Sequence, residues 1–210
     1  MTESTNSPTW KRRLRAVVPA VVLVFVAAAA VYAYMRRTQF ESLEVYGKLP
    51  AFELVDQKNR KVANQDLAGK VVIANFIFTR CPTICPTFSM KMQRVAKRLA
   101  DEDGITFVSF SVDPEYDSPE VLAEFAAKFK ADPERWRFLT GDPETIKRTV
   151  TDGLAIAIEK RGELASGAPD IVHGTHFVLI DGDGLLRGYY NSDTRERIDE
   201  LVRDARGLAD

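Results

Sequence analysis

A nearly continuous apolar stretch at residues 70–79, KVVIANFIFT, constrains the fold of this chain more than any other feature. It is rich in β-branched and aromatic residues, which favours a strand buried on both faces. Such strands are typical of a parallel sheet that is covered by helices. The stretch leads directly into CPTICP, which contains both cysteines of the 210-residue chain, Cys81 and Cys85.

The segments around this stretch alternate between strand and helix patterns. Strands are predicted at 52–55 with a return near 62, and at 70–79, 105–113, 136–141 and 175–190, the last as a hairpin that turns at 181–184. Helices are predicted from 86 to 104, at 118–132, at 142–154 and, capped by Ser192 or Asp193, at 192–208. This alternation predicts an α/β domain. A strand, a cysteine motif and a helix, followed by a late hairpin and a closing helix, is the thioredoxin-like order: a central mixed sheet flanked by helices, here with an extra N-terminal β-hairpin.

Residues 16–35 contain no charged side chain over 20 residues, which is about the length of a transmembrane helix. Four basic residues precede this run and two follow it, which predicts a cytoplasmic N-terminus. The predicted organisation is a cytoplasmic tail at 1–15, a transmembrane helix at 16–35, a spacer at 36–48 and a folded domain at 49–210. The alternatives are a cleaved signal peptide and a buried soluble helix. The anchor and the signal peptide both place the domain on the outer side of a membrane.

The cysteine motif lies where open α/β sheets commonly carry ligands and reactive groups, between a strand and a helix. Pro86 suits the first turn of that helix, which predicts that Cys85 lies at the helix N-terminus with a lowered thiol pKa. Pro82 is expected to keep Cys81 exposed. Two thiolates suit Cu(I), and the same pair can form a disulfide; the spacing does not decide between them. The alternatives are two buried apolar residues or a zinc site, for which four ligands are hard to assemble from so few cysteines and histidines.

The chain has two histidines, His173 and His176. His173 follows the polar, glycine-rich segment 159–170, which is predicted to be a mobile loop, and it is a candidate third ligand that would complete a Cys₂His copper site. His176 begins the next predicted strand, where a structural role is expected. Thr175 stands where thiol-disulfide enzymes of this fold usually have a cis-proline, and this departure favours metal binding.

Several segments together resemble the Sco (SenC) family of copper chaperones, from about Leu49 to the C-terminus and including the N-terminal anchor. They are GKVVIANF, FTRCPTICP, SFSVDPEYDSPEVL, WRFLTG and VHGTHFVLIDGDGLLRGYY. The resemblance implies that Cys81 and Cys85 bind copper together with a distal histidine. The family spacing assigns that role to His173 and leaves His176 beside the site. Asp113 matches a recurrent acid near the family site, although it also suits a turn at the end of a strand.

The expected function is therefore a membrane-anchored copper chaperone that delivers copper to the dinuclear copper site of cytochrome c oxidase subunit II. Other periplasmic copper chaperones or thiol reductants are further expected partners. The expected location is the inner (cytoplasmic) membrane, with a single pass and a periplasmic domain. The alternatives are a thiol-disulfide oxidoreductase that reduces the cysteines of that site, for which His173 would be dispensable, and a copper or redox sensor. A net charge of −1 without a basic stripe predicts no nucleic-acid partner.

Overall fold

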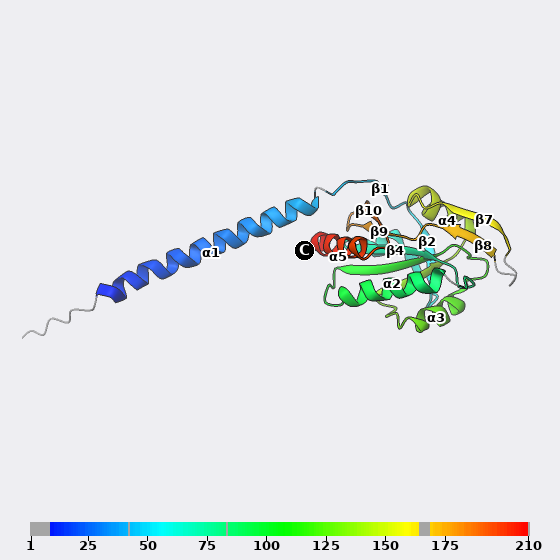
Figure 1. Cartoon of the computed structure of the whole chain (residues 1–210), viewed down its shortest axis with the longest axis horizontal. Helices are drawn as coiled ribbons and strands as arrows, with labels where there is room; N and C mark the ends of the chain where they lie inside the picture. Colours follow the sequence, from blue (N-terminus) through cyan, green and yellow to red (C-terminus); the bar gives the residue numbers. More distant parts are fainter. Residues whose placement is uncertain (1–8, 42, 83, 164–168, 210) are drawn as a thin grey trace, which may run out of the picture. The chain divides into compact units, whose positions relative to one another are not determined.

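A computed structural model describes residues 9–41, 43–82, 84–163 and 169–209 (Figure 1). Nothing is described for the side chains of residues 9–17, 33, 36–41, 160, 163, 170, 172 and 173. The chain divides into two compact units, Met1–Ser42 and Leu43–Asp210, and each is considered by itself.

The first unit contains one helix, α1 (Thr9–Glu41), which includes the whole of the predicted span 16–35. Among the residues that the structure describes, no helix is both long enough and apolar enough to cross a membrane. The transmembrane helix at 16–35 is therefore not shown by the structure and stays a prediction from the sequence.

The second unit is built on an eight-stranded mixed sheet with the order β1-β10-β9-β4-β5-β6-β2-β3. At its centre, β4 (Val71–Ile77) and β5 (Ile105–Ser111) are parallel, and β6 (Trp136–Thr140) is parallel to β5. On the other side of β4, β9 (His176–Ile180) runs antiparallel. Every residue of β4 and β5 is buried. For β4, this confirms the prediction of a strand covered on both faces.

The remaining strands of this sheet belong to short hairpins and edges. They are β1 (Gly47–Lys48), β2 (Glu53–Asp56), β3 (Lys61–Ala63) and β10 (Leu185–Asn191). A short 3₁₀ helix, Asn64–Leu67, follows β3. The hairpins β2–β3 and β9–β10 confirm the two hairpins that the sequence predicts.

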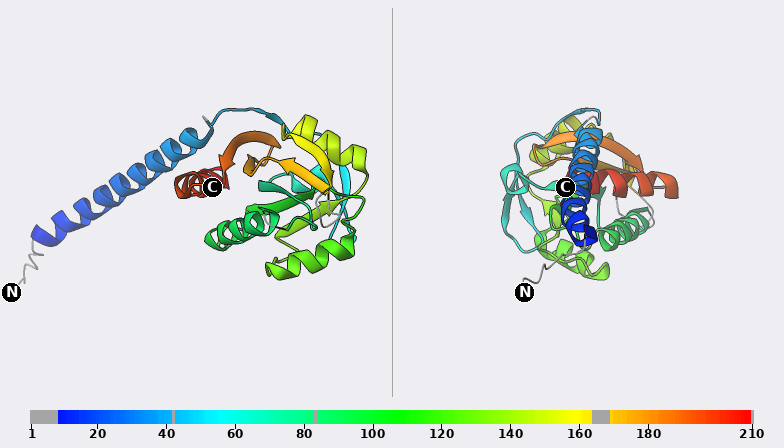
Figure 2. Two further views of the ribbon diagram at one scale, coloured as in Figure 1. Left: turned by 45° about the vertical axis from the view of Figure 1, so that its right-hand side comes forward. Right: turned by 90° about the vertical axis from the view of Figure 1, so that its left-hand side faces the viewer.

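Three helices lie on the same side of the sheet, with α2 (Ile84–Arg98) between α3 (Pro119–Lys128) and α5 (Arg195–Ala209) (Figures 1 and 2). Aromatic contacts join them to the strands. The rings of Phe88 in α2 and Phe177 in β9 have centroids 4.7 Å apart, and both residues are fully buried. The helix that carries Cys85 is thus anchored to the sheet through its second turn.

A short helix, α4 (Pro143–Lys147), continues into a π-helical turn at Arg148–Gly153, within the predicted helix 142–154. Asp142 and Ser118 cap α4 and α3 as the sequence predicts. The predicted cap of α5 is wrong by one or two residues. The hydroxyl of Thr194, instead of Ser192 or Asp193, accepts the Arg197 N–H at 3.4 Å.

The segment predicted as a mobile loop contains two strands instead. β7 (Ile158–Glu163) and β8 (Pro169–His173) form a separate antiparallel two-stranded sheet, and residues 164–168 between them lie outside the described part. The polar, glycine-rich composition concealed this pairing, because a two-stranded ribbon does not require a continuous apolar face.

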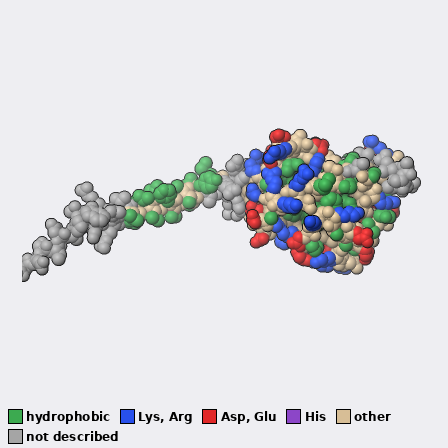
Figure 3. Space-filling model, turned by 60° about the horizontal axis from the view of Figure 1, so that its bottom comes forward, with side chains coloured by type: hydrophobic (Ala, Val, Ile, Leu, Met, Phe, Trp, Pro, Cys, Tyr) green, Lys and Arg blue, Asp and Glu red, His purple; other side chains and the backbone are tan. Residues whose placement is uncertain are grey.

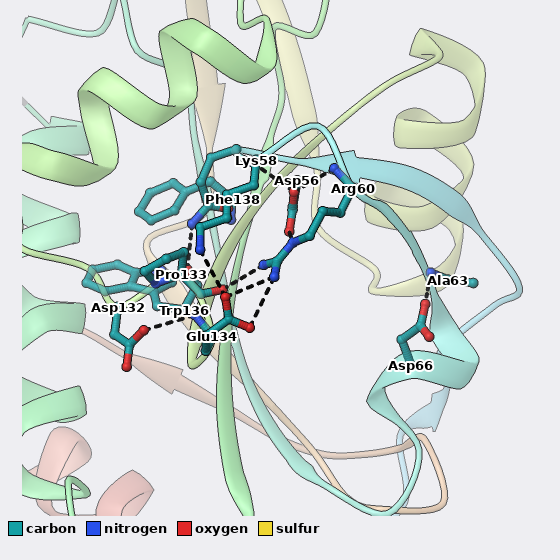
Figure 4. Close-up of polar contacts among 11 residues, drawn as sticks. Asp56, Lys58, Arg60, Ala63, Asp66, Asp132, Pro133, Glu134, Trp136 and Phe138 are labelled. Carbon is teal, nitrogen blue, oxygen red and sulfur yellow. Dashed lines mark hydrogen bonds and ion pairs between the residues drawn. The ribbon is translucent and has the colours of Figure 1, made fainter.

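A buried carboxylate organises the β2–β3 turn (Figure 4). Asp56 is 0% exposed and accepts the backbone N–H groups of Lys58 and Arg60, both at 2.9 Å, and the Nε–H of Arg60 at 2.7 Å. Lys58 and Arg60 also pair with Glu134, which precedes β6. This network connects the β2–β3 hairpin to the start of β6.

The surface beside α2 carries charges of both signs. Figure 3 shows Lys and Arg side chains interspersed with Asp and Glu side chains over this face of the second unit. Some of them connect neighbouring helices: Arg98 of α2 lies 2.6 Å from Asp199 of α5. Exposed pairs of this kind contribute about 0–1 kcal/mol each, so the buried contacts described above dominate the stability of the helix layer.

Candidate metal centre

Both cysteines lie where the chain passes from the sheet into a helix. β4 ends at Ile77, α2 begins at Ile84, and Cys81 lies in the connection between them. Cys85 is the second residue of α2 and Pro86 is the third. The structure thus confirms the predicted strand-to-helix turn, with the proline in the first helical turn where its missing N–H has no cost.

The structure brings the two cysteines together without a disulfide between them. The sulfur of Cys81 accepts the backbone N–H of Cys85 at 3.4 Å. That amide belongs to the first turn of α2, where N–H groups lack partners within the helix. The sequence places Cys85 in the positive field of the helix N-terminus; in the structure, Cys81 also directs its sulfur toward that end.

Burial of the two thiols differs from the prediction. Cys81 is only 9% exposed and Cys85 is 0% exposed, so the expected exposure of Cys81 is wrong. The predicted lowering of the Cys85 pKa is wrong as well. The hydrogen bond with the Cys81 side chain, followed by burial, raises the pKa of Cys85 because both favour the neutral thiol over the thiolate. The burial agrees with the alternative in which the cysteines are simply two buried apolar residues. That alternative does not predict the hydrogen bond from the Cys85 N–H to the Cys81 sulfur.

The residue before Cys81 is held by an ion pair. Arg80 donates from Nε and Nη2 to one oxygen of Asp113, at 3.0 and 2.6 Å, and its guanidinium lies 4.3 Å from the ring centroid of Tyr116. Asp113 follows β5 and its side chain is 3% exposed. The acid that the sequence identifies near the site therefore reaches the cysteine segment through Arg80.

A second acid in the same segment, Asp117, was not identified from the sequence. It is fully buried, and its carboxylate accepts hydrogen bonds from Thr79 and Ser111. Burial raises the pKa of Asp117, and these hydrogen bonds counteract part of that shift. The signal available in the sequence was Ser111, a polar residue at the end of a largely apolar strand.

The histidines lie on two strands that follow each other in the chain but belong to different sheets. His173 is the last residue of β8, where its backbone pairs with Ile158, and its side chain lies outside the described part. His176 is the partly buried first residue of β9, directly after Thr175. Among the described side chains, no three His, Cys, Asp or Glu residues lie close enough together to hold a metal ion. Of the predicted Cys₂His ligands, the structure therefore describes the side chains of the two cysteines and not that of His173.

Two adjacent thiols at a helix start can do two kinds of chemistry. As thiolates they are soft donors that suit Cu(I), and as a dithiol they can be oxidised to a disulfide. The domain is a mixed sheet covered by helices, and the cysteine pair lies between a buried strand and the following helix. These features define a thioredoxin-like domain with a metal-binding or redox-active dithiol.

Comparisons with known proteins then identify the family. The SCO1/SenC family model matches residues 43–210, so the chain belongs to the SCO1/SenC family. The SCO1 protein homolog of Bacillus subtilis (strain 168) is 33% identical over 159 residues, which are 75% of this chain and 81% of that protein.

Two solved structures are also similar. Bradyrhizobium japonicum ScoI with copper bound is 27% identical, with a TM-score of 0.65 over 75% of this chain and 99% of that one. BsSco, a member of the Sco family of cytochrome c oxidase assembly proteins in which a disulfide switch was identified, is 29% identical. Its TM-score is 0.70 over 80% of this chain and 98% of that one.

Proposed function

We propose that this protein is a copper chaperone that binds copper through Cys81, Cys85 and His173. The observation that supports it most is the contact between the two cysteines at the start of α2, within the fold of a family that includes a copper-bound relative. A relative is described as a cytochrome c oxidase assembly protein. The recipient in this proposal is the dinuclear copper site of cytochrome c oxidase subunit II.

Transfer would proceed by exchange of ligands. Cys81 retains some exposure and Cys85 has none, so an incoming thiolate of the recipient would replace Cys81 first. The released Cys81 takes up a proton, and the copper ion passes on without a change of oxidation state once Cys85 and His173 are replaced in turn. The buried position of Cys85 makes its exchange slower than that of Cys81.

The decisive experiment is a copper titration of the full chain in detergent, reduced and under argon, with His173→Ala and His176→Ala as a matched pair. We expect one copper per chain for the unmodified protein. His173→Ala should weaken Cu(II) binding by about 100-fold, because the site loses one of its three ligands, and should alter the thiolate-to-Cu(II) absorption. His176→Ala should change neither.

The alternative function gives a different result. If the unmodified chain binds no copper, and its dithiol reduces protein disulfides equally well with and without His173, then the protein is a thiol-disulfide oxidoreductase. Equal copper affinity in both histidine variants would instead refute His173 as a ligand while leaving the dithiol site intact.

The proposal includes a membrane anchor at residues 16–35, with the N-terminus in the cytoplasm and residues 49–210 in the periplasm. It is supported by the uncharged run and by the excess of basic residues before it. We expect the full chain to remain in the membrane fraction after alkaline carbonate extraction, and a chain lacking residues 16–35 to be released. Release of both chains would contradict the anchor.

A further inference from the structure

The carboxylate of Asp117 is surrounded by hydrogen-bond donors. One oxygen accepts the hydroxyl of Thr79 at 2.5 Å, and the other accepts the hydroxyl of Ser111 at 2.6 Å. The backbone N–H of Thr79 lies 3.3 and 3.2 Å from the two oxygens. Since both oxygens serve as acceptors, the site suits an ionised carboxylate better than an amide, which has only one acceptor atom.

These contacts reach the cysteine segment by two routes. Thr79 stands two residues before Cys81, so the first route is direct. In the second route, Ser111 also accepts the backbone N–H of Asp113 at 3.1 Å, and Asp113 holds Arg80. Both residues that lead into Cys81 are thus tied to the segment 111–117.

Such a buried acid is unfavourable unless its contacts compensate for the lost hydration. Asp117 is not needed as the cap of α3, because Ser118 already caps that helix. The hydrogen bonds of Asp117 with Thr79 instead lead toward the strand-to-helix turn that carries the dithiol.

We infer that Asp117 is the positioning residue of the dithiol, holding Thr79 and Arg80 so that Cys81 keeps its sulfur at the N–H of Cys85. The inference rests on the proposed function, in which this dithiol binds copper. A disulfide requires the two sulfurs to approach to about 2.05 Å. Any movement of Cys81 that this approach requires is opposed by the contacts that hold Thr79 and Arg80. The contacts of Asp117 therefore favour the dithiol over the disulfide.

The test is the redox equilibrium of the full chain with dithiothreitol. The protein dithiol and the cyclic disulfide of dithiothreitol exchange to give the protein disulfide and reduced dithiothreitol, and alkylation followed by mass spectrometry measures the fraction oxidised. A substitution that destabilises the dithiol and disulfide forms equally leaves this equilibrium constant unchanged. A substitution that alters the position of Cys81 in the dithiol form changes it. For Asp117→Asn we expect a shift of about tenfold toward the disulfide, a change of about 30 mV for a two-electron couple.

Thr79 provides a matched pair of variants and Asp56 a distant control. Thr79→Val removes the hydroxyl at nearly constant volume and should shift the equilibrium in the same direction, while Thr79→Ser, which retains the hydroxyl, should stay within about twofold of the unmodified chain. Asp56 is equally buried and also accepts backbone N–H groups, but at the β2–β3 turn. Asp56→Asn should lower the melting temperature and leave the redox equilibrium unchanged.

The inference is wrong if Asp117→Asn and Thr79→Val lower the melting temperature but keep the redox equilibrium within twofold of the unmodified chain. If Asp117→Asn does not fold, the comparison of Thr79→Val with Thr79→Ser decides. Copper binding by the unmodified chain is measured separately. If that chain binds no copper, the copper function is refuted, while the dithiothreitol equilibrium still decides the role of Asp117.

Discussion

Replacing either cysteine by serine is expected to lower the affinity for Cu(I) by at least about 100-fold, because the soft thiolate is exchanged for a hard hydroxyl that stays protonated. Cys81→Ser and Cys85→Ser should each have this effect, since neither sulfur alone provides a two-coordinate thiolate site. The measurement is competition with a chromophoric Cu(I) chelator, using the reduced full chain.

Met90 offers a matched control for this experiment. It lies on the same helix as Cys85, is 44% exposed and carries another soft sulfur. Met90→Leu should bind Cu(I) as well as the unmodified chain. Copper retained at full affinity by both serine variants would show that the ion binds elsewhere, and would overturn the proposed site.

Replacing Phe88 by alanine is expected to reduce the free energy of unfolding by about 3–5 kcal/mol, the usual cost of removing a buried aromatic ring. Phe88 is 1% exposed and packs on Phe177, so its loss opens a cavity between α2 and β9. Urea unfolding followed by near-ultraviolet circular dichroism measures the change. Because Phe88 lies three residues after Cys85, Cu(I) affinity should fall in the same variant.

Met90→Ala is the control for the packing experiment. Its side chain is partly exposed on the same helix, so its truncation should change the free energy of unfolding by no more than about 0.5–1 kcal/mol. A loss below about 1 kcal/mol for Phe88→Ala would mean that α2 does not depend on this contact for its place on the sheet.

Much of the fold could be predicted because it is encoded in local patterns. The apolar run at 70–79 became the buried strand β4, and the caps at Ser118 and Asp142 are visible within a few residues of sequence. The β7–β8 ribbon could not be predicted in this way. β7 is mostly polar, and the ribbon is defined by pairings between distant residues, such as Ile158 with His173.

The cysteine pair could likewise be predicted from its spacing, but its surroundings could not. Thr79 meets Asp117 only because β4 and β5 pair in parallel with Ile77 opposite Ser111. That register is a long-range property that the sequence of neither strand specifies. The predicted lowering of the Cys85 pKa was wrong because the hydrogen bond with the Cys81 side chain, followed by burial, raises that pKa.

The two edges of the eight-stranded sheet have a consequence for behaviour at high concentration. β1 has two residues and β3 has three, and each includes an exposed lysine, Lys48 and Lys61. Short, positively charged edge strands offer few free amide and carbonyl groups to a second copy of the chain. Pairing of these two strands with a second copy of the chain is therefore disfavoured, even where many copies crowd together.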